Sequence, residues 1–182
     1  MDRMSTTSHA QQAAESAREA PVRCAILTIS DTRTEATDTG GATVARLAQD
    51  AGHLVLHRVI VRDDAPAIRS AIEAWLGDPS IDAVLTTGGT GIARRDSTIE
   101  VVRGLLTQEL EGFGELFRML SFDAVGPAAM LSRAVGGLVV RPAAAGGDTF
   151  IFAMPGSVNA VETAMSKLIG PQLAHLVWER RR

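Results

Sequence analysis

The residues best suited to chemistry lie in one glycine-rich stretch that follows a short apolar run at 81–85. Three glycines stand within four positions at 88–91, and Arg94, Arg95 and Asp96 come soon after them. Glycines let the backbone approach a ligand closely, and the N–H groups of a loop before a helix favour phosphate. The two arginines could add bidentate phosphate contacts, and the carboxylate suits magnesium. The stretch therefore predicts a phosphate-binding loop, although its spacing is equally compatible with a tight strand-to-helix turn.

Two common nucleotide-binding fingerprints do not fit this stretch. Arg94 stands where the dinucleotide pattern G-x-G-x-x-G requires its third glycine, and no Gly-Lys-Ser/Thr follows for a Walker A loop. A redox dinucleotide enzyme is therefore disfavoured. Ser97 and Glu100 have the spacing of a capping box, which predicts that a helix begins at Ser97.

Strands and helices alternate through the first half of the chain, and this alternation decides where the loop lies. Apolar runs predict strands at 22–29, 54–61 and 81–85, and apolar residues at helical spacing predict helices after Asp38 and around Pro66. Such alternation is typical of an α/β fold with a parallel sheet, whose ligands bind beyond the carboxyl ends of the strands.

Acidic residues follow each of these three strands. Because the carboxyl ends of parallel strands meet at one edge of a sheet, we expect the acids to gather there. The preference of turns for aspartate is the alternative explanation for some of them. The residues concerned are Asp31, Asp38, Asp63, Asp64 and Asp96.

The second half of the chain continues the alternation with weaker signals. We expect helices at 97–106 and 116–120, a short helix at 127–133, strands at 134–140 and 149–153, and helices at 158–169 and from Pro171 onward.

Composition limits the kind of protein. With 182 residues, 46% of them hydrophobic, and a net charge of −3, the chain predicts one globular domain without general affinity for nucleic acid. No apolar run approaches the ~18 residues of a membrane span, and residues 1–21 hold no signal-like apolar core. We expect a flexible tail at 1–21, a single domain at 22–182 and a cytoplasmic location. Cys24 is expected in the core, and no His/Cys cluster suggests zinc.

Several short motifs, in this order, resemble those of the molybdopterin adenylyltransferase and MoaB/MogA-type molybdenum cofactor proteins. The resemblance extends from Val22 to about Leu176. The phrases at 112–121 and 151–157 look closer to the MoaB branch, whereas the Arg-Arg-Asp triplet resembles the MogA type. The motifs are Ser30-Asp31, Asp38 before Gly40, Asp63-Asp64, Thr86-Thr87-Gly88-Gly89-Thr90-Gly91 with Arg94-Arg95-Asp96, Gly112-Phe113-Gly114-Glu115, Ser132-Arg133 and Pro155-Gly156-Ser157.

This resemblance implies a three-layer α/β/α sandwich around a mostly parallel sheet, assembled as a homotrimer or homohexamer. It implies magnesium-dependent adenylyl transfer from ATP to the phosphate of molybdopterin, with other cofactor-assembly proteins as partners. Asp63 and Asp96 match the family's essential acids and are expected to be catalytic and to hold the metal. The residues expected to bind the substrates are Ser30, Asp31, Asp38, Thr87, Gly88, Gly89, Thr90, Gly91, Arg94, Arg95, Pro155, Gly156 and Ser157.

Two departures from the family pattern leave an alternative open. Arg62 replaces the proline common before the first acid, so Asp64 could serve instead of Asp63. Val158 and Asn159 stand where many members have Pro and Lys, and a cation is lost. The alternative is a non-catalytic molybdopterin-binding or protein-interaction paralogue. Ser157 and Asp38 have the simpler alternative of capping the helices that follow them.

Overall fold

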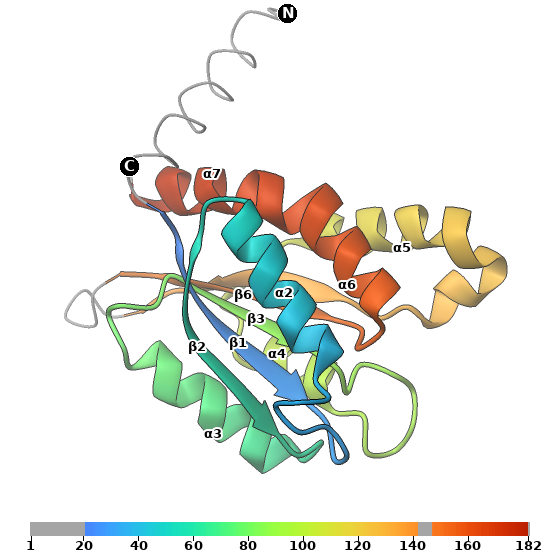
Figure 1. The fold of residues 1–182 in the computed structure, drawn as a ribbon. Helices are drawn as coiled ribbons and strands as arrows, with labels where there is room; N and C mark the ends of the chain where they lie inside the picture. Colours follow the sequence, from blue (N-terminus) through green and yellow to red (C-terminus); the bar gives the residue numbers. More distant parts are fainter. Residues whose placement is uncertain (1–20, 142–146, 182) are drawn as a thin grey trace, which may run out of the picture.

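The computed structural model describes residues 21–141 and 147–181, which form a six-stranded sheet covered by helices on both faces (Figure 1). The strand order is β2-β1-β3-β6-β5-β4. The first four strands in this order run parallel, and β5 and β4 are each antiparallel to the strand before them. The strands are β1 (Arg23–Ile29), β2 (Leu54–Val61), β3 (Ala83–Thr87), β4 (Gln108–Glu109), β5 (Val135–Val139) and β6 (Thr149–Met154).

Two apolar cores lie on opposite faces of this sheet. One joins the sheet to α2, α5, α6 and α7, and the other joins it to α3 and α4. The predicted α/β/α sandwich with a mostly parallel sheet is therefore confirmed. The helices are α2 (Thr39–Asp50), α3 (Ala65–Leu76), α4 (Thr98–Arg103), α5 (Glu111–Val125), the 3₁₀ segment η1 (Gly126–Leu131), α6 (Val158–Ala164), the π-helical segment η3 (Met165–Ile169) and α7 (Gly170–Arg181).

The first half of the chain folds as its pattern predicts. The strand at 54–61 is observed with the same bounds, and Pro66 lies in the first turn of α3, where a missing N–H costs no helical hydrogen bond. Gly52 follows the end of α2 with φ +85°, a conformation that suits glycine. The strand expected at 81–85 begins and ends two residues later, so that β3 includes the two threonines before the glycine loop.

Glycine and proline are less disruptive in the second half than their propensities suggest. The helix expected at 116–120 begins at Glu111 and includes Gly112 and Gly114. A Cβ on Gly114 would lie 2.9 Å from the Ala134 carbonyl oxygen, so this glycine permits close packing of α5 against the chain before β5. The two-residue strand β4 was not predicted.

The last two predicted helices form one continuous helical run. Within η3, the Gly170 N–H donates to the Met165 carbonyl, five residues earlier. This π-type step widens the helix just before Pro171, whose missing N–H would otherwise interrupt a regular α-helix. Leu173 and Val177 of α7 thereby reach the core.

The prediction of a flexible tail at 1–21 lies, apart from Pro21, outside the described residues. Within the described part of the chain, no helix combines the length and the apolar character needed to cross a membrane.

Candidate functional site

Four loops meet at the carboxyl edge of the sheet, where β2, β1, β3 and β6 end. The arrowheads of β1 and β2 mark this edge in Figure 1. The loops after β3 and β6 are joined by two hydrogen bonds, from the Gly88 N–H to the Met154 carbonyl at 3.2 Å and from Thr87 Oγ1 to the Pro155 carbonyl at 3.1 Å. The expected ligand-binding segments at 87–91 and 155–157 therefore lie side by side.

The loop after β3 requires glycine at its first two positions. Gly88 and Gly89 have φ of +98° and +61°, in the left-handed region that L side chains rarely adopt. A Cβ on Gly88 would come closer than 3.0 Å to the Ile29 carbonyl oxygen, and one on Gly89 would lie 2.9 Å from Asp63 Oδ1. The turn is thus packed directly against the end of β1 and against the first predicted catalytic acid.

Three acids from three loops approach one another beside this turn. The Asp63 N–H donates to Asp31 Oδ1 at 3.2 Å, and the Ala93 N–H donates to Asp96 Oδ2 at 3.0 Å. Burial raises the pKa of Asp63, and the neighbouring Asp96 carboxylate, with a smaller effect from Asp31, raises it further. Asp63 and Asp96, the predicted pair, therefore lie close together, and their catalytic role stays a prediction.

Unpartnered buried oxygens mark the centre of the site. Asp63 Oδ1, Ser97 Oγ and Thr98 Oγ1 are buried and have no hydrogen-bond partner among the described residues. A Cβ on Gly89 would contact both Asp63 Oδ1 and Thr98 Oγ1, so these two oxygens border the same turn. Buried polar atoms normally have partners, and the exceptions call for an explanation such as a bound ion or ligand.

The donor set fits magnesium bound together with a phosphate ligand. Among the described residues, no group of three or more His, Cys, Asp or Glu could hold a metal ion. Magnesium commonly takes one or two carboxylates and completes its coordination with water and substrate phosphate. Asp63 and Asp96 supply such a pair of carboxylates.

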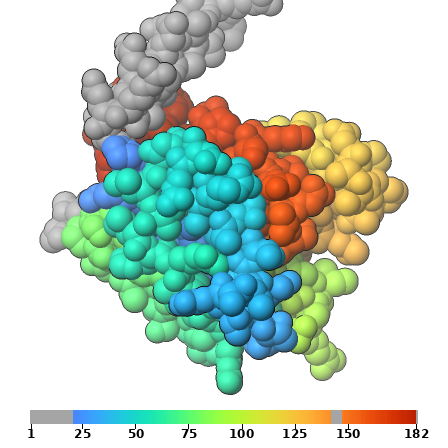
Figure 2. Space-filling model, in the orientation of Figure 1, coloured from blue at the N-terminus to red at the C-terminus, as the bar shows by residue number. Residues whose placement is uncertain are grey.

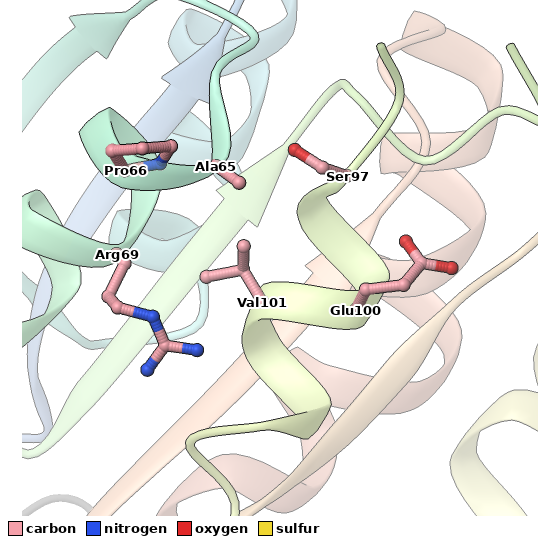
Figure 3. A pocket seen from close by; sticks show the side chains of 6 residues that line it. All are labelled: Ala65, Pro66, Arg69, Ser97, Glu100 and Val101. Carbon is pink, nitrogen blue, oxygen red and sulfur yellow. The ribbon is translucent and has the colours of Figure 1, made fainter. Parts of the chain in front are cut away.

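A pocket of about 440 Å³ lies next to this cluster, between α3 and α4. Figure 3 shows Arg69 on the α3 side and Glu100 on the α4 side, with Val101 between them. Ser97, whose Oγ is unpartnered, lines the same pocket. The pocket thus adjoins the acids but is not lined by them.

The remaining expected ligand residues on the loops differ in exposure. Arg94 and Arg95 are exposed, and Arg95 lies 3.9 Å from Asp31. Ser30 Oγ accepts the N–H groups of residues 32 and 33 and so shapes the loop after β1. Thr90, within the glycine turn, is buried. The exposed arginines are therefore the cations of this group that solvent, or an anion, can reach.

Asp38, Asp64 and Ser157 act as helix caps. Asp38 caps α2 through the Gly41 N–H at 2.8 Å and is almost fully buried beneath Arg58 at 2.9 Å. Asp64 caps α3, and Ser157 caps α6. The simpler alternative thus accounts for the positions of Asp38 and Ser157, and their binding of substrate stays a prediction. Asp64 is exposed, so Asp63 is the acid placed in the cluster.

Comparison with known proteins assigns the chain and its fold to a family. Residues 25–175 match the family model described as a probable molybdopterin binding domain. The chain is 48% identical over 180 residues to molybdenum cofactor biosynthesis protein B of Bacillus cereus, covering 98% of this chain and 99% of that protein. The chain belongs to this molybdenum cofactor biosynthesis family.

Solved structures of the family agree with the MoaB-like features of the sequence. A crystal structure of molybdenum cofactor biosynthesis protein B has a TM-score of 0.83 at 49% identity and covers 90% of this chain and 98% of that one. A structure of MogA has a TM-score of 0.73 at 26% identity and covers 86% and 98%. The resemblance to the MoaB branch is confirmed.

Two arginines near the predicted acids were not among the predicted site residues. Arg58 projects from β2 to pair with Asp38, and Arg133 bonds the carbonyls of the glycine loop and the carboxylate of Glu100. The predicted capping box is wrong, although Ser97 is the N-cap of α4, because the Ser97 side chain makes no capping hydrogen bond. The Glu100 carboxylate accepts from Arg133 instead of reaching back to the start of the helix. The Ser132-Arg133 motif was the available signal.

Proposed function

We propose that this protein transfers the adenylyl group of ATP to the phosphate of molybdopterin and releases pyrophosphate. The observation that carries the proposal is the buried, unpartnered Asp63 Oδ1, which lies against the glycine turn and is coupled to Asp96. Membership in a molybdenum cofactor biosynthesis family supports the substrate class.

The proposed reaction needs little covalent chemistry from the protein. A phosphate oxygen of molybdopterin attacks the α-phosphorus of ATP, the new P–O bond forms, and the bond from the α-phosphorus to the bridging oxygen of pyrophosphate breaks. A phosphate is already ionised at neutral pH, so no general base is required. The protein's task is to align two polyanions and offset the charge that develops between them.

The residues at the carboxyl edge divide that task. Asp63 and Asp96 would hold magnesium, which when bound neutralises phosphate charge and orients the phosphate oxygens. Gly88 and Gly89 allow the phosphates to approach the backbone, and the exposed Arg95 beside Asp31 can move to a bound phosphate. Burial and the neighbouring Asp96 raise the pKa of Asp63, and a bound cation would favour the charged form of this carboxyl.

The test measures pyrophosphate and adenylylated molybdopterin after incubation of the protein with molybdopterin, ATP and magnesium. We expect turnover by the wild type and a loss of at least about a hundredfold in Asp63→Asn and Asp96→Asn. Asp64→Asn is the matched control, because Asp64 is adjacent in sequence but exposed at the cap of α3, where asparagine serves equally well. Equal activity in all three variants, or no turnover by the wild type, would overturn the proposal.

A second candidate is a protein that binds molybdopterin or another protein without adenylyl transfer. Large apolar side chains exposed on α5 and η1 favour an interaction role, and the segment that carries them projects from one side of the molecule in Figure 2. Exposed apolar patches commonly mark interfaces. The residues are Leu116, Met119, Phe122, Val125, Met130 and Leu131.

The same patch supports the proposed homotrimer or homohexamer. Light scattering on the purified protein would give the mass of the assembly, and Met119→Lys should reduce it. Binding of molybdopterin without consumption of ATP would favour the second candidate. We also propose the cytoplasm as the location, where a single cysteine such as Cys24 stays reduced.

A further inference from the structure

Arg133 lies between η1 and β5 and binds the backbone carbonyls of the glycine loop. Its Nε donates to the Thr90 carbonyl at 2.9 Å, and its Nη2 donates to the Gly91 carbonyl at 2.6 Å and, more weakly, to the Asp96 carbonyl at 3.5 Å. Its Nη1 bonds Glu100 Oε1 at 2.5 Å. One planar side chain thus contacts the start of the loop, its end and the first turn of α4.

These contacts fix the orientation of two peptide groups. Because a trans peptide is planar, its N–H points opposite to its C=O. When Arg133 holds the carbonyls of Thr90 and Gly91, the N–H groups of Gly91 and Ile92 must point away from it. Neither of these two N–H groups donates a hydrogen bond to another described residue, so both stay available to an acceptor.

Glu100 keeps the guanidinium in place. The Arg133 hydrogen bond lowers the pKa of Glu100 and so favours its charged carboxylate form. Arg133 is only partly exposed, and its five donors in a rigid fork match several acceptors at once. A lysine at this position would offer a single ammonium group and could not bridge the same carbonyls with the same geometry.

We propose that Arg133 is a positioning residue: it holds the loop at 90–96 so that Asp96 faces Asp63 and the free N–H groups face the phosphate ligand. The inference rests on the proposed function for what the loop binds. It assigns Arg133 no contact with substrate, because its donors are engaged by the loop and by Glu100.

Hydrogen exchange in the full-length, ligand-free protein tests the structural half of the inference. Arg133→Ala should accelerate amide exchange at 89–97 by about tenfold or more at the hydrogen-bonded amides of Ala93 and Asp96, because the loop that holds their acceptors is released, while exchange in β1 and β3 stays unchanged. Arg103→Ala is the matched control: it removes an exposed arginine of α4 that pairs with Glu109 at 3.2 Å and does not contact the loop.

Kinetics and chemical rescue test the functional half. In Arg133→Ala, kcat for pyrophosphate release should fall by about ten- to a hundredfold, with a smaller change in KM for ATP. Guanidinium chloride below its denaturing range should restore part of kcat and slow the exchange at 89–97. Arg133→Lys should show the same faster exchange at 89–97 as Arg133→Ala. If Arg133→Ala does not fold, Arg133→Lys takes its place in both the exchange and the kinetic measurements.

The outcomes separate this inference from the proposed function. If the wild type releases no pyrophosphate, the proposed function fails, and the exchange experiment still decides whether Arg133 holds the loop. Unchanged exchange at 89–97, or an equal acceleration throughout the sheet, overturns the positioning role. The positioning role is also overturned if a variant shows faster amide exchange at 89–97 but keeps the kcat of the wild type.

Discussion

Replacement of Gly88 by alanine tests how tightly the glycine turn is packed. Gly88 has φ +98°, and its N–H donates to the Met154 carbonyl of β6. An added Cβ would lie closer than 3.0 Å to the carbonyl oxygen of Ile29, a backbone atom at the end of β1. A flexible side chain could move aside, but here relief requires a shift of the strand or of the turn.

The expected cost has two parts. A non-glycine residue in the left-handed region costs about 1–2 kcal/mol, and forcing an extra methyl group into packed surroundings costs about 1–3 kcal/mol. Gly88→Ala should therefore lower the free energy of unfolding by about 2–5 kcal/mol. Gly52→Ala is the matched control, because Gly52 has φ +85° with no heavy atom within 4 Å of the added Cβ, and it should show only the first part.

Urea unfolding of the two variants and the wild type, followed by circular dichroism, measures the difference. We expect the midpoint of Gly88→Ala to fall well below that of Gly52→Ala, with similar m-values. Equal losses in the two variants would refute the reasoning, since they would show that the turn absorbs the methyl group without cost. A larger loss in Gly52→Ala would refute it as well.

Three further predictions concern buried polar groups. Because the pKa of Asp63 is raised in the folded state, ionisation of this carboxyl above its unfolded pKa lowers the stability of the fold. Asp63→Asn should therefore increase the free energy of unfolding, measured by urea titration, at pH 7 but not well below pH 3.8. Asp38→Ala should cost about 2–4 kcal/mol in the same assay, because the Gly41 N–H and Arg58 lose a buried acceptor, whereas Asp64→Ala should cost about 1 kcal/mol. Burial raises the pKa of Cys24 to about 12, so iodoacetamide should label it only after denaturation, as mass spectrometry would show.

Each of these predictions has a result that contradicts it. A stability gain for Asp63→Asn that persists at pH 3 would show that charge is not its cause. Equal costs for the Asp38 and Asp64 variants would mean that burial adds nothing to the cap. Rapid labelling of native Cys24 at pH 8 would place that thiol at the surface.

The sequence was most informative where local and tertiary preferences agree. The bounds of β2, the cap of α2 and the start of α3 followed from apolar periodicity, Asp38 and Pro66, whereas the cap of α3 by Asp64 was not predicted. Glycine at 114 and proline at 171 misled the prediction, because a distant backbone segment in the first case and a π-type step of the helix in the second decide their effect. Local propensity cannot register such contacts.

The sequence indicated which acids lie near the candidate site, but not which of them face it and which are buried elsewhere. The sequence placed the acids at one edge, and the structure joins Asp63, Asp96 and Asp31 there. It could not show that Asp38 is withdrawn beneath an arginine of β2, because that pairing spans twenty residues and depends on strand register. The binding roles of the individual residues stay predictions.

The π-helical segment before Pro171 also accommodates one residue more than a regular helical turn, without changing the direction that the following helix faces. Each residue advances an α-helix by about 100°, and the segment inserts one residue relative to a regular helix. Removal of a single residue from 165–169 would therefore convert the wide turn to a regular α-helical turn and leave the apolar stripe of α7, with Leu173 and Val177, facing the sheet. We expect this part of the chain to tolerate the deletion of one residue better than the regular turns of α7 do.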